Sequence, residues 1–209
     1  MMFADRGAAG RALAERLTRY AGARTVVLAL PRGGVPVAAP IARALAAPLE
    51  VFLVRKLGVP AEPELAMGAI ASGGVRILNR DVIEELRIDA ATVARVAAAE
   101  ERELARRERA YRTGRARVTL AGATAIVVDD GAATGATMRV AVRAIRASGP
   151  AALVVALPVA VPEICRALRS VADDVVCLLE PVRLGGVGRW YERFEEVRDD
   201  DVRTLLGGA

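Results

Sequence analysis

Short apolar runs recur along the chain, and each of them leads into small or polar residues. Runs of this length, rich in β-branched residues and bounded by such signals, are typical of buried strands. Because the runs are continuous rather than alternating, they favour strands covered on both faces, as in a parallel sheet. The predicted core strands are Thr25–Leu30, Leu49–Val54, Ala125–Val128, Ala151–Leu157 and Asp174–Leu179.

Segments with helical periodicity separate these strands. Leu13 and Leu17 lie one turn apart in an amphipathic opening segment. The predicted helices of the core are Arg6–Tyr20, 35–46, 138–148 and Pro162–Ala172. The alternating order predicts an α/β fold with a central, mostly parallel sheet flanked by helices and joined by right-handed crossovers. Ligands of such sheets bind outside the carboxyl ends of the strands.

The middle of the chain departs from this order. Two prolines and a glycine in Gly58–Glu64 predict an exposed, mobile loop. Ala66–Ala71 and Val75–Leu78 predict a hairpin, since Ser-Gly-Gly separates them. The following segment, Arg80–Arg112, is helical in pattern and dense in charges of both signs. It predicts a helical insert over residues 80–114 within a single domain of residues 1–209.

Composition narrows the chemistry. Charged residues make up 26% of the 209 residues, as in a globular protein, and the uncharged runs are too short or too interrupted by proline to span a membrane. Charges near the N-terminus argue against a signal peptide, so we expect a cytoplasmic protein. The chain has no histidine, which excludes histidine-based catalysis and histidine-ligated metals. Cys165 and Cys177 lack a paired C-x-x-C partner, which argues against a zinc site and favours free thiols.

The stretch that indicates a chemistry follows the strand Ala125–Val128. Asp129 and Asp130 come first, and a helix with an apolar face follows a turn made only of small residues: Gly131, Ala132, Ala133, Thr134, Gly135, Ala136 and Thr137. Small residues let backbone N–H groups surround a phosphate at the positive end of the helix dipole. The turn lacks the lysine of a Walker A loop and the spacing of GxGxxG. A ribose 5-phosphate fits better, with its hydroxyls on the two carboxylates.

This stretch, VVDDGAATGAT, resembles the ribose-phosphate signature of the type I phosphoribosyltransferases. The resemblance implies that Asp129 and Asp130 are the catalytic carboxylates, that they contact Mg²⁺ directly or through water, and that residues 131–137 hold the 5-phosphate. A strand-to-helix turn with two solvated aspartates is the simpler alternative. Similarity to a group of bacterial phosphoribosyltransferase-like proteins of unassigned substrate extends over most of the chain.

The resemblance also assigns a pyrophosphate site. The loop after the first strand, formed by Pro31, Arg32, Gly33 and Gly34, is similar to the pyrophosphate loop of the family, and a cis peptide is expected next to Arg32. Arg55 and Lys56 are expected to touch the pyrophosphate from the segment that closes over the site. An ordinary βα turn and a solvated basic pair are the alternatives for these two features.

The tail is expected to form a small C-terminal hood over residues 180–209. It gathers Trp190, Tyr191 and Phe194 in a chain that is otherwise poor in aromatic residues. In the resembled family a hood covers the nucleobase, so Trp190 and Tyr191 are candidates for base binding. Packing of the tail onto the domain explains the same cluster.

The resemblance implies transfer of the 5-phosphoribosyl group from phosphoribosyl pyrophosphate to a nitrogen acceptor such as a nucleobase, with Mg²⁺ as cofactor and a homodimer as an expected assembly. A regulator that senses phosphoribosyl pyrophosphate and binds nucleic acid is the alternative, because the net charge is +5 and seven arginines lie between Arg102 and Arg117. A phosphohydrolase with Asp129 as nucleophile is a third hypothesis, although it lacks a neighbouring lysine.

Overall fold

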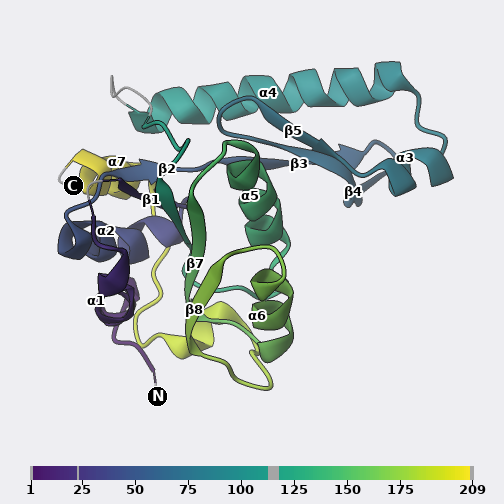
Figure 1. Ribbon diagram of the computed structural model, residues 1–209. Helices are drawn as coiled ribbons and strands as arrows, with labels where there is room; N and C mark the ends of the chain where they lie inside the picture. The colour runs from purple at the N-terminus through teal and green to yellow at the C-terminus, as the bar shows by residue number, and fades with distance from the viewer. Residues whose placement is uncertain (1, 23, 113–117, 208–209) are drawn as a thin grey trace.

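The computed structural model describes residues 2–22, 24–112 and 118–207 (Figure 1). Its centre is a five-stranded sheet in the order β2-β1-β6-β7-β8, and every neighbouring pair runs parallel. The strands are β1 (Thr25–Ala29), β2 (Leu49–Val51), β6 (Thr124–Val128), β7 (Ala152–Val159) and β8 (Asp174–Leu179). The predicted α/β class and parallel core are therefore confirmed.

Alternate residues of each core strand enter different hydrophobic clusters. In β6, Ile126 and Val128 pack on one face of the sheet, and Ala125 and Val127 pack on the other. Successive side chains of a strand point to opposite faces, and helices cover both faces here. This double burial explains why the strands appear as continuous apolar runs in the sequence.

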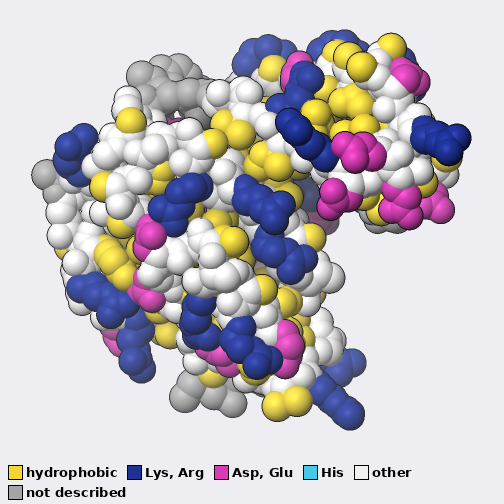
Figure 2. All heavy atoms as spheres, turned by 45° about the vertical axis from the view of Figure 1, so that its right-hand side comes forward, with side chains coloured by type: hydrophobic (Ala, Val, Ile, Leu, Met, Phe, Trp, Pro, Cys, Tyr) yellow, Lys and Arg dark blue, Asp and Glu magenta, His cyan; other side chains and the backbone are white. Residues whose placement is uncertain are grey.

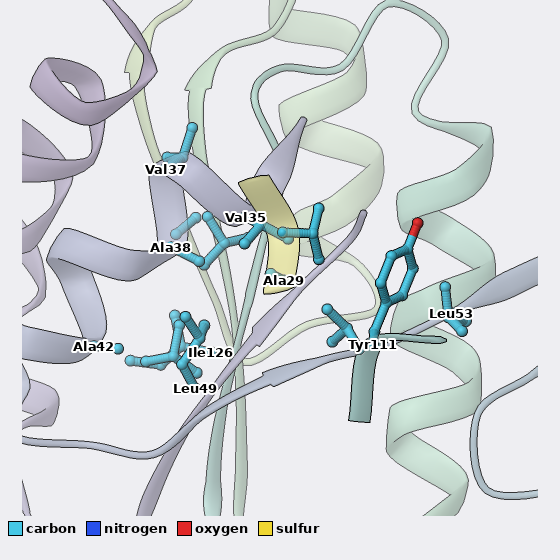
Figure 3. Close-up of a cluster of buried hydrophobic side chains, with 14 of the residues drawn as sticks. Ala29, Val35, Val37, Ala38, Ala42, Leu49, Leu53, Tyr111 and Ile126 are labelled. Atoms are coloured by element: carbon cyan, nitrogen blue, oxygen red, sulfur yellow. The ribbon is translucent and has the colours of Figure 1, made fainter. Parts of the chain in front are cut away.

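Helices flank both faces of the sheet, as Figure 1 shows. One layer is formed by α1 (Arg6–Leu17), which a 3₁₀ turn (Thr18–Tyr20) extends, and α2 (Gly34–Leu45); the other is formed by α5 (Ala136–Ala147) and α6 (Pro162–Arg169). Figure 3 shows the cluster under α2, where Ala42 lies beside Leu49 and Ile126, and Val35 lies near Ala29. None of the helices in the described ranges is long and apolar enough to cross a membrane.

A second sheet follows the first two strands and changes the predicted course of the chain after Leu49. The predicted strand Leu49–Val54 is split, because β2 ends at Val51 and Val54 begins a strand of another sheet. That sheet has the antiparallel order β3-β4-β5, with β3 (Val54–Val59), β4 (Glu62–Ala71) and β5 (Val75–Leu78). The hairpin β4–β5 was predicted.

The loop predicted over Gly58–Glu64 is too long, since only the exposed turn of residues 60 and 61 separates β3 from β4 and the other residues belong to the two strands. The pairing register shifts on both sides of Gly58, which marks a bulge. Pro63 has no backbone N–H, and it lies where β4 extends beyond β5, whose pairing begins at Gly68. Pro63 is therefore compatible with a strand at this position, and Pro60 lies in the turn between β3 and β4.

The predicted helical insert is present as α3 (Arg80–Glu85) and α4 (Ala90–Arg112), up to the end of the described part; residues 113 and 114 lie outside it. In Figure 1, α4 lies along the sheet β3–β5, and the helix and this sheet both extend past α5. We call residues 54–112 the arm. The C-terminal α7 (Asp199–Gly207) packs against α2 and α4. The extent of a single domain over residues 1–209 stays a prediction.

Candidate active site

Asp129 and Asp130 lie at the carboxyl end of β6, the central strand of the sheet, and both are half-buried. The backbone N–H of Asp130 donates to Oδ1 of Asp129 at 2.9 Å. Burial raises the pKa of the Asp129 carboxyl, and the neighbouring Asp130 charge raises it further. Burial also raises the pKa of Asp130, against the opposing effect of the Arg6 guanidinium. The strand end thus concentrates negative charge in a poorly solvated place.

The small-residue turn after them leads into α5. Gly135 has φ of 67°, a left-handed conformation that favours glycine, and it precedes the first helical residue, Ala136. The N-cap residue Gly135 has no side chain to cap α5, and the Thr134 hydroxyl accepts from the Ala136 N–H at 3.3 Å. A cavity of about 230 Å³ is lined by Asp129, residues 131–138 and Val187. This geometry suits an anion at a helix N-terminus.

The first loop touches the second at its glycines. A Cβ at Gly33 would lie 2.1 Å from Oδ2 of Asp130, and one at Gly34 would lie 2.6 Å from the carbonyl oxygen of Val128. The peptide between Pro31 and Arg32 is cis, as expected. The structure therefore brings the predicted pyrophosphate loop and the two aspartates into direct contact.

Arg6 is the site residue that sequence reasoning missed. Its Nε and Nη2 both lie 2.8 Å from Oδ2 of Asp130, and its Nη1 donates to the carbonyl oxygen of Glu195 at 2.8 Å. The guanidinium carbon lies 3.7 Å from the centroid of the Phe194 ring, a cation–π contact. The side chain is 12% exposed. Asp5 caps α1 through the Ala8 N–H, and this local signal fixes where the helix begins but not what Arg6 contacts.

The tail also reaches Arg32. Glu196 accepts from Nη2 of Arg32 at 2.9 Å, and both side chains are largely exposed. An exposed pair of this kind contributes little to stability. Arg32 can therefore exchange Glu196 for another anion at small cost.

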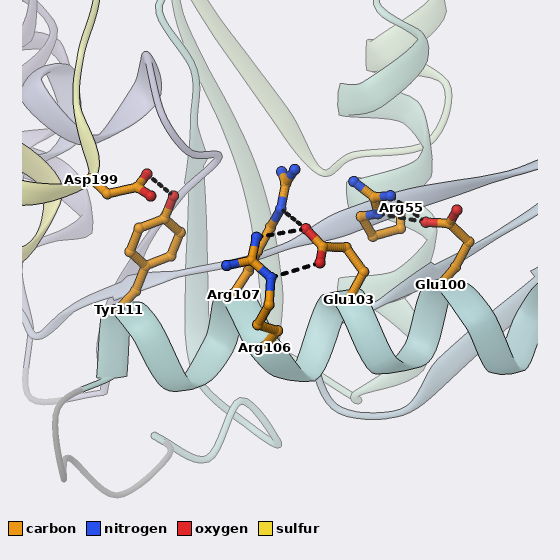
Figure 4. Close-up of polar contacts among 7 residues, drawn as sticks. All are labelled: Arg55, Glu100, Glu103, Arg106, Arg107, Tyr111 and Asp199. Atoms are coloured by element: carbon orange, nitrogen blue, oxygen red, sulfur yellow. Dashed lines mark hydrogen bonds and ion pairs between the residues drawn. The ribbon is translucent and has the colours of Figure 1, made fainter.

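Arg55 and Lys56 lie on β3 rather than on a loop. Arg55 pairs with Glu100 of α4, with Nε 2.6 Å from Oε2, as Figure 4 shows. The two basic residues line a cavity of about 470 Å³ together with the hairpin tip and α4. Their predicted contact with pyrophosphate stays a prediction, and Arg55 would have to leave Glu100 to make it.

The two residues predicted to bind the base occupy different surroundings. Tyr191 is 3% exposed, its ring packs against Phe3 and Phe194, and its hydroxyl donates to the Asp130 carbonyl oxygen at 2.6 Å. We expected a stacking surface at this residue, but the structure places it as a support beneath Asp130. Trp190 is half-buried and donates to the Leu184 carbonyl oxygen at 3.0 Å, beside a cavity of about 430 Å³.

Comparison with known proteins identifies the family of the chain. A family model described as the phosphoribosyl transferase domain matches residues 4–192. The chain belongs to this family. The match covers the predicted pyrophosphate loop (residues 31–34) and the small-residue turn (residues 131–137) of this phosphoribosyltransferase domain, together with Arg6 and Tyr191.

Two relatives from Mycobacterium tuberculosis carry the provisional name phosphoribosyl transferase, and each is 48% identical over 208 residues. The alignment covers 100% of this chain but 47% of each relative, so the chain spans about half their length. The crystal structure of the protein TT1426 from Thermus thermophilus is 42% identical, with a TM-score of 0.88, and the match covers 99% of this chain and 98% of that one.

Proposed function

We propose that this phosphoribosyltransferase domain binds phosphoribosyl pyrophosphate with Mg²⁺ and transfers the 5-phosphoribosyl group to a nitrogen acceptor, releasing pyrophosphate. The observation that carries the proposal is the contact between the two loops. Gly33 lies against the Asp130 carboxylate, and the turn of residues 131–137 begins at the same strand end. One small molecule with a 5-phosphate, a ribose and a pyrophosphate can span this arrangement.

Each group of residues has a definite task. The N–H groups of residues 131–137 hold the 5-phosphate at the start of α5, and the neighbouring carboxylates accept the ribose hydroxyls. Arg32 and the N–H groups of its loop neutralise the leaving pyrophosphate. In the reaction the C1–oxygen bond breaks and its electron pair leaves with pyrophosphate, while the nitrogen lone pair of the acceptor forms the C1–nitrogen bond and the acceptor releases its N–H proton. The protein accelerates this displacement mainly by orienting the reactants and stabilising charge.

The donor set fits a hard cation, because oxygen ligands suit Mg²⁺. Within the described part of the chain, Asp129 accepts a hydrogen bond at Oδ1, which leaves Oδ2 for a cation. Asp130 has Arg6 on Oδ2, so Oδ1 is its available oxygen. When bound, Mg²⁺ would supply charge neutralisation at the pyrophosphate and ribose oxygens. Asp129 is the better candidate for a direct ligand, and Asp130 for a ribose contact.

The acceptor site is proposed beside Trp190, whose ring borders a cavity with Arg183 and Arg189. A planar nitrogen base could stack there while these cations bind its polar edge. We also propose a homodimer as the working assembly, in keeping with the family resemblance.

Nucleic-acid binding receives no specific support. On α4, Glu103 pairs with Arg106 and Arg107, and Figure 4 shows these contacts along one side of the helix. Figure 2 shows basic side chains spread over the face in view, with acidic ones among them. Arg115 and Arg117 lie outside the described residues.

The test is ³¹P NMR of the protein with Mg²⁺ and phosphoribosyl pyrophosphate, before and after addition of a pool of purine and pyrimidine bases. We expect pyrophosphate to appear only with the pool, and splitting the pool then identifies the acceptor. Asp130→Asn should keep the fold and lose the turnover. If ligand signals stay unchanged in the presence of the wild-type protein, the proposed binding is wrong; broadening without turnover would instead favour a sensor.

A further inference from the structure

Two thiols and a carboxylate lie together where α6 packs on β8. Cys165 is buried in α6, Cys177 is half-buried in β8, and Glu180 is exposed just after that strand. The two sulfur atoms and one carboxylate oxygen all lie within 4.8 Å of one another. Both cysteines are free thiols, as expected. Their spacing of twelve residues argues against a zinc site in the sequence, but the packing of α6 on β8 brings the two cysteines together.

We propose that Cys165, Cys177 and Glu180 form a binding site for a thiophilic divalent cation such as Zn²⁺. Zinc takes thiolate sulfur at about 2.3 Å and carboxylate oxygen at about 2.0–2.2 Å in a tetrahedron. The ligand atoms of such a tetrahedron lie roughly 3.5–3.8 Å apart, so the three groups need only small movements. The ligand set excludes Mg²⁺, which prefers oxygen ligands only.

Charge and hydrogen bonding complete the site. Nη2 of Arg169 lies 2.8 Å from Oε1 of Glu180, and the two side chains are 47% and 30% exposed. Binding of the cation would release both thiol protons to solvent, including the one that Cys177 donates to the Leu179 carbonyl oxygen at 3.3 Å. Two thiolates, one carboxylate, one guanidinium and a divalent cation then sum to zero charge. A ligating carboxylate is commonly oriented by a second hydrogen-bonding partner, and Arg169 is placed to serve as one.

The surroundings provide an entry path and an open position. The neighbours of Cys165 on α6, Ile164 and Leu168, are buried, so a cation would enter from the side of Glu180. Three protein ligands leave a fourth position for water. A Cβ at Gly135 would lie 2.8 Å from Ile164, so the helix that carries Cys165 also packs against the phosphate turn. A bound cation would fix α6 against β8 next to that turn.

The experiment is a Cd²⁺ titration of the fully reduced, folded chain, followed by the ultraviolet charge-transfer absorption of cadmium–thiolate bonds. We expect one equivalent to give a band, Zn²⁺ to remove it by competition, and Zn²⁺ alone to raise the melting temperature. Cys177→Ser should reduce the band by about half and lower the affinity at least tenfold, since it removes one of two thiolate ligands. Glu180→Gln should weaken binding severalfold. The control is Glu163→Gln, because Glu163 is exposed on α6, the helix of Cys165, and pairs with Arg166; this variant should bind like the wild type.

The proposal is overturned if the reduced wild-type chain gives no band, or if Cys165→Ser and Cys177→Ser leave it unchanged. Because Cys177 and Glu180 are not fully buried, their variants are expected to fold even if Cys165→Ser does not. Circular dichroism of each variant checks this. The readout requires no phosphoribosyl substrate, so its outcome is independent of the proposed transferase activity.

Discussion

Arg6 and Asp130 form an ion pair across 124 positions of sequence, and the contact decides which oxygen of Asp130 is free. Nε and Nη2 of Arg6 share Oδ2, so the carboxylate cannot rotate without losing both bonds. A guanidinium has a planar fork that an ammonium cannot reproduce. Arg6 is therefore a positioning residue for the proposed ribose contact, acting through Asp130.

We predict that Arg6→Gln weakens binding of Mg²⁺ and phosphoribosyl pyrophosphate by about tenfold to a hundredfold, the range expected for hydrogen bonds to a charged group. Burial raises the pKa of Asp130 and so favours its neutral form, and Arg6→Gln removes the main opposing effect. Arg6→Lys should recover only part of the loss. Titration calorimetry gives the affinities.

The matched control is Arg16→Gln, an exposed arginine in the last turn of the same helix. It should bind like the wild type. An Arg6→Gln protein with native circular dichroism and unchanged affinity would show that the ion pair has no part in ligand binding.

Asp129 gives a prediction on stability. The pKa of the Asp129 carboxyl is raised in the folded state, so its protonated form favours folding. This contribution to stability is fully present at pH values below the ordinary aspartate pKa of about 3.9. That contribution is lost as the pH rises through the folded pKa. Asp129→Asn should therefore stabilise the ligand-free chain at neutral pH, by about 2–4 °C for each kcal/mol gained. Asn can keep the acceptor that Oδ1 offers to the Asp130 N–H.

Melting curves at pH 7 and pH 4, recorded with a chelator, test this sign. The gain should shrink toward the acidic end, and binding of phosphoribosyl pyrophosphate should be lost at both values. A gain of equal size at both pH values would mean that the burial of charge at Asp129 is not its cause.

At the scale of elements, α1 reaches its position because Gly10 lets it approach α2. A Cβ at Gly10 would lie 2.2 Å from the Val37 carbonyl oxygen and 2.5 Å from Pro40. In the same helix, a Cβ at Gly7 would meet side-chain atoms rather than backbone, namely Oδ1 of the capping Asp5 at 3.3 Å and Nη1 of Arg11 at 3.5 Å. Two glycines that look alike in sequence therefore have different surroundings.

We predict that Gly10→Ala lowers the free energy of unfolding by about 1–3 kcal/mol, because backbone must move to make room. It should also weaken ligand binding, since α1 carries Arg6. Gly7→Ala should instead be neutral or stabilising by about 0.5–1 kcal/mol, the usual gain inside a helix. Urea unfolding measures both, and equal effects of the two variants would contradict this account of the helix crossing.

The sequence predicts elements well where one local signal dominates. The strand before Asp129 is continuous and β-branched, and the turn after it contains only Gly, Ala and Thr, so strand, turn and α5 all appear where expected. The run after Leu49 is equally apolar, yet it divides between two sheets. Only its partners distinguish the halves, because Val51 pairs with Ala29 and Val54 pairs with Ala71.

At the scale of the whole molecule, the tail connects distant parts that no local pattern relates. Phe3 bridges Tyr191, Glu196 reaches Arg32, and α7 packs on α2 and α4. The sequence predicted a hood from its aromatic residues, but not that Tyr191 would support Asp130. Such contacts join residues more than sixty positions apart, so they depend on the assembled fold rather than on periodicity.

Tyr111 is the point where the arm is tied to the tail. The residue is 5% exposed at the end of α4, and its hydroxyl donates to Oδ1 of Asp199 in α7 at 2.7 Å (Figure 4). Hydrogen bonds to a charged group contribute about 1.5–3 kcal/mol. Tyr111→Phe should lower the free energy of unfolding by that amount and increase hydrogen exchange in α7, while the ring still fills its place in the core.

The same contact predicts a pH dependence. Burial, together with the bond to Asp199, raises the pKa of Tyr111 to about 12. An unfolded tyrosine ionises at about 10, so the Tyr111 contribution is present below pH 10 and is lost as the pH rises toward 12. Over this interval the wild type should lose stability more steeply than Tyr111→Phe, which has no proton to release there. Parallel curves for the two proteins would mean that the hydroxyl is not buried against Asp199, and the tail would then need another anchor on the arm.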